Sequence, residues 1–198
     1  MTESATPRPQ RADAERTTRK ILTTADQLLG QDPTTTLEQI ATAAGVARAT
    51  LHRRFTSREA LIEAMTVSAL THVNEAIEAG RPGTAPPLVA LHQVTANVID
   101  VKSGWRFTLN HTHPASDAVS TLQDQITHRC LQLLARAQQA GLLPAETDLS
   151  WPQRTYYALL DIAIHEHAEH DTNTDELADR VVTTLLNGVG TRVQQPSQ

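Results

Sequence analysis

The sequence has few of the residues that build disulfides, β-sheets or membrane spans. Cys130 is the only cysteine among 198 residues, so no internal disulfide can form and nothing indicates an oxidising compartment. Extended β-branched runs are missing, and the 10 prolines and 8 glycines fall mostly between periodic segments, which favours an all-α protein. The polar N-terminus has no apolar signal region, and no segment approaches the ~20 apolar residues of a membrane helix. We therefore predict a soluble, cytoplasmic, all-α protein with no membrane partner.

Positively charged residues are fewer than negatively charged ones, and the balance between them changes along the chain. The net charge is −5. Residues 1–60 contain nine Lys and Arg against seven Asp and Glu, a net charge of +2, whereas the remainder contains eight against fifteen, a net charge of −7. A weakly basic first third followed by an acidic body is typical of a small DNA-reading module joined to a domain with another task.

The spacing of apolar residues divides the chain into an arm, a small domain, a helical body and a tail. Residues 1–13 are polar, contain two prolines and show no apolar period, so we expect a disordered arm. From Ala14 onward the apolar residues recur at helical spacing. We place the first domain at 14–58, the body at 59–192 and a short tail at 193–198.

Glycine and proline clusters separate the helices of the body. The pattern predicts about nine helices in the whole chain. Thr174 is the expected N-cap of the last helix, because acids follow it where the helix dipole favours them. The helices predicted from residue 57 onward lie at about 57–79, 87–102, 104–110, 115–140, 151–170 and 174–190.

The stretch TTLEQIATAAGVARATLHRRF, residues 35–55, contains two short helices and one glycine. Thr36 is placed as an N-cap, and Gln39 three residues later completes a capping box. Gly45 follows the first helix where a left-handed turn is needed, which a Cβ would resist. A second helix is predicted at about 47–54, with a polar, positive face exposed. This is the pattern of a helix-turn-helix, whose second helix enters the DNA major groove.

The residues of that second helix have the chemistry for DNA contacts. Arg48 can form a bidentate pair with guanine, and Thr50 can contact a base through its hydroxyl or methyl group. Arg53, Arg54 and Arg58 are better placed for phosphates. The alternative is a structural helix pair with a solvated basic face. The predicted DNA-binding residues are Thr36, Arg48, Ala49, Thr50, His52, Arg53, Arg54 and Arg58.

This region resembles the TetR family of bacterial transcriptional repressors. The family pattern contains "IL..A..L" and "T...IA..AGV...TLY..F.SKE.L", and this chain has ILTTADQLL and TLEQIATAAGVARATLHRRFTSREAL. The resemblance covers roughly residues 16–62. The chain has His52 where the family usually has a tyrosine that helps hold a phosphate, and Arg58 where the family has lysine.

The resemblance implies a homodimer, because two reading heads match a palindromic operator. It also implies a small-molecule effector that releases the DNA. In the family the last two helices form the dimer bundle, and the ligand cavity lies inside the middle helices. The expected dimer residues are Leu159, Ile162, Leu177, Val181 and Leu185, and the alternative for any one of them is a place in the internal core. The expected ligand residues, around an aromatic and histidine-bearing segment, are Trp105, Phe107, Leu109, His111, His113, Tyr156 and Tyr157.

Two other functions remain open, although no cofactor, resident metal or catalytic residue is expected. The histidine-rich segments HTH at 111–113 and HEHAEH at 165–170 allow a metal-responsive DNA-binding regulator, because their spacing can suit zinc. A helical dimeric interaction protein without DNA binding is the other alternative. Enzyme motifs such as GxSxG and the P-loop are missing from the sequence, so we expect no catalysis.

Overall fold

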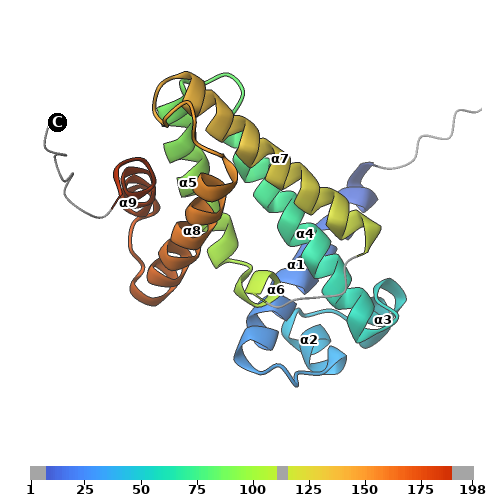
Figure 1. The fold of residues 1–198 in the computed structure, drawn as a ribbon. Coiled ribbons are helices and arrows are strands. Elements are labelled where there is room, and N and C mark those ends of the chain that lie inside the picture. The colour runs from blue at the N-terminus through green and yellow to red at the C-terminus, as the bar shows by residue number, and fades with distance from the viewer. Residues whose placement is uncertain (1–7, 111–115, 189–198) are drawn as a thin grey trace, which may run out of the picture. The chain divides into compact units, whose positions relative to one another are not determined.

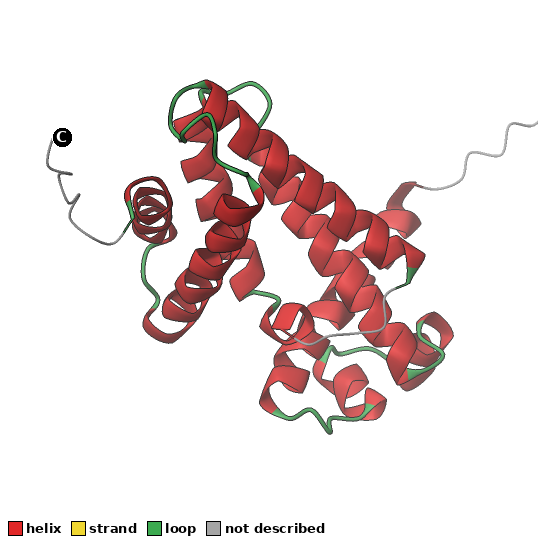
Figure 2. Cartoon of the chain, viewed as in Figure 1, coloured by secondary structure: helices red, strands yellow, loops and turns green. Residues whose placement is uncertain are grey.

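The structure is a computed structural model that describes residues 8–110 and 116–188 (Figure 1). Regular structure in these residues is entirely helical, with no strand (Figure 2), which confirms the predicted all-α class. The described helices are α1 (Arg8–Gln31), α2 (Leu37–Ala43), α3 (Arg48–Arg54), α4 (Arg58–Ala79), α5 (Pro87–Ser103), α6 (Arg106–Asn110), α7 (Asp117–Gln139), α8 (Ser150–His170) and α9 (Thr174–Asn187).

The helix boundaries follow the predicted ones closely, and the two clear differences lie at helix starts. α1 begins at Arg8, earlier than the predicted Ala14 and inside the segment expected to be an arm. The N-cap of α9 is Asn173 and not Thr174, because the Asn173 Oδ1 accepts the amides of the second and third helical residues at 2.8 and 3.3 Å. These bonds satisfy two of the donors that every helix start leaves free.

The described residues form two compact units that differ from the predicted domains. Unit 1 lies within residues 1–72 and 104–122, and unit 2 lies within 73–103 and 123–198. The division therefore falls inside α4 and α7 instead of after residue 58, and α6 belongs to unit 1. Apolar spacing shows where a helix has a buried face, but it does not show which other helix covers that face.

Unit 1 is held together by fully buried aliphatic side chains. α1 packs against α2 and α6, and α2 packs against α3. Ile21, Leu29, Ile40, Leu51 and Met65 have no exposed surface. Each such side chain contributes about 1.5–3 kcal/mol through burial. This contribution stabilises α2 and α3, which have only seven residues each and are too short to persist alone.

A buried carboxylate attaches α6 to α1 within unit 1. Asp26 is only 4% exposed, and its Oδ1 accepts the backbone N–H of Thr108 at 2.8 Å and the Thr108 hydroxyl at 2.6 Å. Trp105, just before α6, stacks on His72 with ring centroids 5.7 Å apart. A five-residue helix such as α6 cannot form without such contacts, because helix nucleation is unfavourable.

Unit 2 contains α5, α8 and α9, which pack against one another. A buried hydrogen bond of 2.8 Å joins the Tyr156 hydroxyl on α8 to the Thr95 Oγ1 on α5. The Thr95 hydroxyl donates its own proton to the Leu91 carbonyl at 2.6 Å, so Tyr156 is the donor to Thr95. Burial raises the pKa of Tyr156, and the phenol therefore stays neutral in the core.

The turn after α4 requires glycine and is held by an arginine of α7. A Cβ on Gly80 would lie 2.5 Å from the Val94 Cγ2 and 2.9 Å from the Val94 nitrogen, so no larger residue fits without moving α5. The Arg136 guanidinium donates to the Pro82 carbonyl and, at 2.9 Å, to the Ala85 carbonyl. Both interactions lie within unit 2 and fix the connection to α5.

Replacing Asp26 with alanine should lower the free energy of unfolding by about 1–3 kcal/mol, because the Thr108 amide and hydroxyl are left buried without an acceptor. Urea denaturation followed by circular dichroism measures this change. Asp13→Ala is the matched control, since Asp13 lies on the same helix with its side chain 69% exposed and should cost less than about 0.5 kcal/mol. Equal effects of the two substitutions would contradict a special role for Asp26.

Candidate nucleic-acid interface

A capping box and a left-handed turn fix α2 relative to α3. The Thr36 Oγ1 accepts the Gln39 amide at 3.3 Å, and the Gln39 Oε1 accepts the Thr36 amide at 2.7 Å. Gly45 has φ of 65°, the conformation that glycine adopts without steric cost. The cap, the turn and the limits of the second helix are confirmed, and they form the predicted helix-turn-helix.

The exposed face of α3 is polar and positively charged. Arg48, Ala49 and Arg53 are exposed, Thr50 is half-buried, and Leu51 is fully buried against the rest of unit 1. The first turn of α3 therefore presents Arg48, Ala49 and Thr50 away from the core. In a helix-turn-helix, these N-terminal residues of the second helix are the ones that meet base edges.

The arginines predicted to contact phosphates differ in their environments. Arg58 donates to the Pro33 carbonyl at 2.5 Å and to the Thr35 carbonyl at 2.6 Å, so it holds the loop before α2. Arg54 donates to the Thr18 hydroxyl on α1. Arg53 is exposed and forms no hydrogen bond or ion pair with the other described residues. The sequence pattern did not distinguish the two internally bonded arginines from the free one.

Glu38, which the sequence pattern did not single out, lies directly beside two residues that are predicted to contact DNA. Its Oε1 is 2.5 Å from the Arg48 guanidinium and 3.5 Å from the His52 Nε2. The pKa of Glu38 is lowered by its own backbone amide at the start of α2, by the charge of Arg48 and by the adjacent His52 ring. The helix dipole alone explains an acid near a helix N-terminus. The position of Glu38 in the sequence therefore did not indicate a contact with Arg48.

The chain is similar to known bacterial regulators over most of its length. Residues 21–65 match the family described as "Bacterial regulatory proteins, tetR family". The HTH-type transcriptional repressor LfrR of Mycolicibacterium smegmatis is 30% identical over 176 residues, which cover 88% of this chain and 91% of LfrR. The chain belongs to the TetR family. It is therefore a DNA-binding transcriptional regulator with a helix-turn-helix.

Solved structures of the TetR family share this fold. The structure of LfrR from Mycobacterium smegmatis in complex with proflavine has a TM-score of 0.72 and 28% identity, covering 89% of this chain and 98% of that one. PfmR from Thermus thermophilus has a TM-score of 0.73 and 20% identity, covering 86% of this chain and 99% of its own. The similarity to PfmR concerns the fold alone.

The residues predicted to bind a ligand in this TetR-family chain fall into different compact units. Trp105 and Phe107 are buried in unit 1, and Leu109 is half-buried there. Tyr156 is buried in unit 2, whereas Tyr157 is 39% exposed. The predicted residues His111 and His113 lie outside the described residues. Packing in two separate cores accounts for the buried aromatic side chains without a ligand.

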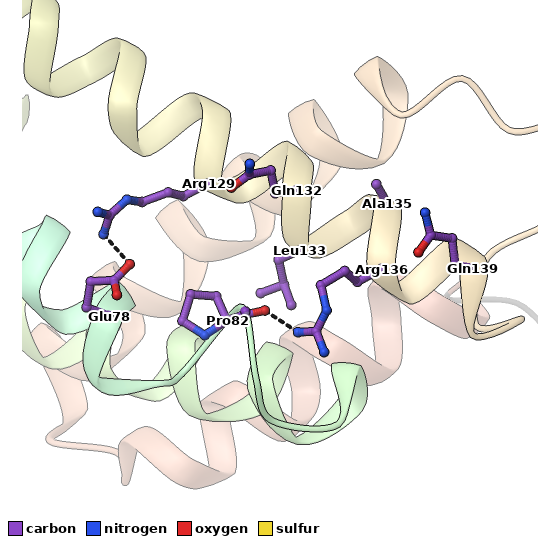
Figure 3. Close-up of a pocket in the computed structure, with 9 residues that line it drawn as sticks. Glu78, Pro82, Arg129, Gln132, Leu133, Ala135, Arg136 and Gln139 are labelled. Carbon is purple, nitrogen blue, oxygen red and sulfur yellow. Dashed lines mark hydrogen bonds and ion pairs between the residues drawn. The ribbon is translucent and has the colours of Figure 1, made fainter.

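A cavity of about 570 Å³ lies in unit 2 beside α7 (Figure 3). Its size falls in the range of small-molecule sites. Arg129, Gln132, Leu133 and Arg136 of α7 line one side, and Arg129 forms an ion pair with Glu78. The basic side chains are thus already engaged within the chain, and none of the residues predicted to bind ligand lines this cavity.

The residues expected at the dimer interface differ in how deeply they are buried. Leu177 and Val181 are only 2% and 4% exposed and belong to the core of unit 2, so they are not on a face open to a partner. This corrects the expectation from helical spacing, which cannot tell an internal face from an intermolecular one. Leu159 and Leu185 are half-buried, whereas Ile162 is 63% exposed.

Two of the three histidines at the end of α8, His165 and His167, have partners within the chain. The His165 Nδ1 lies 2.9 Å from the Asp161 carbonyl oxygen, and the His167 Nδ1 lies 2.6 Å from the Thr172 carbonyl oxygen. Within 8–110 and 116–188, no three His, Cys, Asp or Glu side chains are grouped so as to hold a metal ion. None of the described helices is both long and apolar enough to cross a membrane.

Arg53→Ala should affect DNA binding, whereas Arg58→Ala should affect stability. Arg53→Ala should weaken binding to all duplexes alike and reduce the salt slope by about 1, because one phosphate contact is lost. Arg58→Ala should lower the free energy of unfolding by about 1–2 kcal/mol, because two hydrogen bonds that hold the loop before α2 are lost. Fluorescence anisotropy at several salt concentrations and urea denaturation measure both quantities.

Each of these two variants serves as the control for the other. Arg53→Ala should keep the wild-type unfolding midpoint, since exposed side chains without partners contribute little to stability. An Arg58→Ala variant with wild-type stability and a reduced salt slope would show that Arg58 contacts phosphate and would contradict its assignment to the loop.

Proposed function

We propose that this TetR-family protein is a homodimeric repressor that binds an inverted-repeat operator and is released by a small organic effector. The observation that carries the proposal is the exposed face of α3, where Arg48, Ala49 and Arg53 project from a helix fixed by the cap and the Gly45 turn. As part of this proposal, DNA reading belongs to residues 14–58, and effector binding and dimerisation belong to residues 59–192, although the compact units divide inside α4 and α7.

Each half-site would be read by the first turn of α3. Arg48 would pair with guanine, and Ala49 and Thr50 would contact neighbouring bases. Arg53 would bind a phosphate, while Arg54 and Arg58 would act through the contacts that they make inside unit 1. Thr36 would position α2 through its capping box. One helix reads only a few base pairs, so specific binding requires two copies related by a twofold axis.

The dimer face that we propose lies on α8. Trp151 and Ile162 are 67% and 63% exposed, and eleven residues of α-helix place them on the same side. The Arg154 guanidinium lies 5.8 Å from the centroid of the Trp151 ring. Exposed aromatic and aliphatic side chains with an adjacent arginine are typical of the centre of a protein interface.

The chemical class of the effector is proposed from a related repressor. LfrR, the 30% identical repressor, has been solved in complex with proflavine, which supports an organic molecule as the ligand. Such a molecule must bind the state with low DNA affinity more tightly, because equal affinity for both states shifts no population. A hundredfold loss of operator affinity corresponds to about 2.7 kcal/mol of coupling.

DNase footprinting on the DNA that flanks the gene should reveal a protected inverted repeat. The experiment uses excess competitor DNA and about 150 mM salt, where non-specific binding is weak. Proflavine added to the protected complex then tests release by an organic molecule. Absence of a protected repeat in the flanking DNA, followed by failure to select any sequence from a random pool, would contradict the operator proposal.

Ile162→Glu should convert the dimer to a monomer, because it places a charge in the centre of the proposed apolar contact. Sedimentation velocity should show the monomer, and operator affinity should fall at least tenfold since two heads no longer act together. Leu88→Glu is the matched control, because Leu88 is also an exposed apolar residue, 48% exposed, on another helix of unit 2. Dimers formed equally by both variants would contradict the α8 face.

A further inference from the structure

The carboxylate of Glu38 forms an ion pair with one residue of the proposed DNA-reading helix, Arg48, and lies close to a second, His52. Glu38 is on α2, whereas Arg48 and His52 are one turn apart on α3. The Glu38 Oε1 lies 2.5 Å from the Arg48 Nη2 and 3.5 Å from the His52 Nε2. The contact between Glu38 and Arg48 therefore joins α2 to the first residue of α3 across the turn.

Stability is a poor explanation for this bridge. The side chains of Arg48, Glu38 and His52 are 70%, 43% and 40% exposed. Ion pairs that open to water contribute little to folding, because solvent screens the charges and ordering two long side chains costs entropy. α2 already packs against α3, and each helix buries one aliphatic side chain completely, Ile40 on α2 and Leu51 on α3. The bridge is therefore better explained by what it does to the arginine.

The bridge restricts the arginine without using up its hydrogen-bonding capacity. A guanidinium has five N–H donors, and the contact with Glu38 involves the Nη2 nitrogen. The other nitrogen donors of Arg48 stay available for a base edge. A free arginine would pair readily with any nearby phosphate, and such contacts carry no sequence information.

We propose that Glu38 is a positioning residue that sets sequence specificity, by holding the Arg48 guanidinium for a base edge and keeping it from phosphates. This inference rests on the proposed DNA-reading role of α3. The negative charge of Glu38 opposes a phosphate that approaches Arg48, which weakens binding to every duplex. The base contact of Arg48 compensates for that loss only where guanine is present.

The test compares Glu38→Gln with wild type on two duplexes, the footprinted operator and a scrambled duplex of the same length. Glu38→Gln should bind the scrambled duplex about five- to tenfold more tightly and the operator within about twofold of wild type, a range that fits the coupling of contacting residues. The ratio of the two affinities should fall accordingly. Glu63→Gln is the matched control, because Glu63 is an exposed acid on α4 of the same unit, and it should leave the ratio unchanged.

A double-mutant cycle shows whether Glu38 acts through Arg48. In an Arg48→Ala background, Glu38→Gln should change the affinity for the scrambled duplex no more than Glu63→Gln does. An equal gain in both backgrounds would mean that Glu38 acts only as a general negative charge and would overturn the inference. Unchanged urea midpoints of all variants exclude a loss of fold as the cause.

The outcomes separate this inference from the proposed function. If wild type prefers no duplex over another, the operator proposal fails and the inference fails with it. If wild type prefers the operator and Glu38→Gln keeps the same preference, only the role of Glu38 is overturned. Glu38→Asp, which keeps the charge on a shorter side chain, should give a ratio between those of wild type and Glu38→Gln.

Discussion

The packing of α2 against α3 across the left-handed Gly45 is the constraint on which the proposed DNA-reading surface depends. Both helices have seven residues and would not persist in water by themselves. α2 packs against α3, and Ile40 on α2 and Leu51 on α3 have no exposed surface. Their burial fixes the direction of α3, and every exposed residue of that helix takes its position from this contact.

The arginines on and next to α3 are of two kinds: some bond to other parts of unit 1, and others are exposed. Arg54 and Arg58 are bonded to α1 and to the loop before α2, so they hold the helices in place. Arg53 is exposed, and Arg48 is shared between solvent and Glu38. The proposed reading head thus has few free charges, and a small number of free charges keeps non-specific binding to DNA phosphates weak.

Much of the fold and part of the site were predictable from local patterns. The capping box, the glycine turn and the limits of the second short helix follow from hydrogen bonding and backbone sterics within a few residues. The roles of Arg54 and Arg58 were not predictable in this way, because their acceptors at Thr18 and Pro33 are distant in sequence. The burial of Leu177 and Val181 likewise depends on α5 and α8. Helical spacing of apolar residues does not show which helices will cover them.

The sequence by itself determined the all-α class and the signals of the helix-turn-helix, namely the capping box and the glycine turn, since these depend on interactions over one or two helical turns. Only the tertiary structure decided that α6 joins unit 1 through Asp26 and Thr108, and that Glu38 contacts Arg48. It also decided that Ile162 faces solvent while Leu177 does not. The reason is that a buried or paired group is defined by its neighbours in space, which packing brings together from distant parts of the chain.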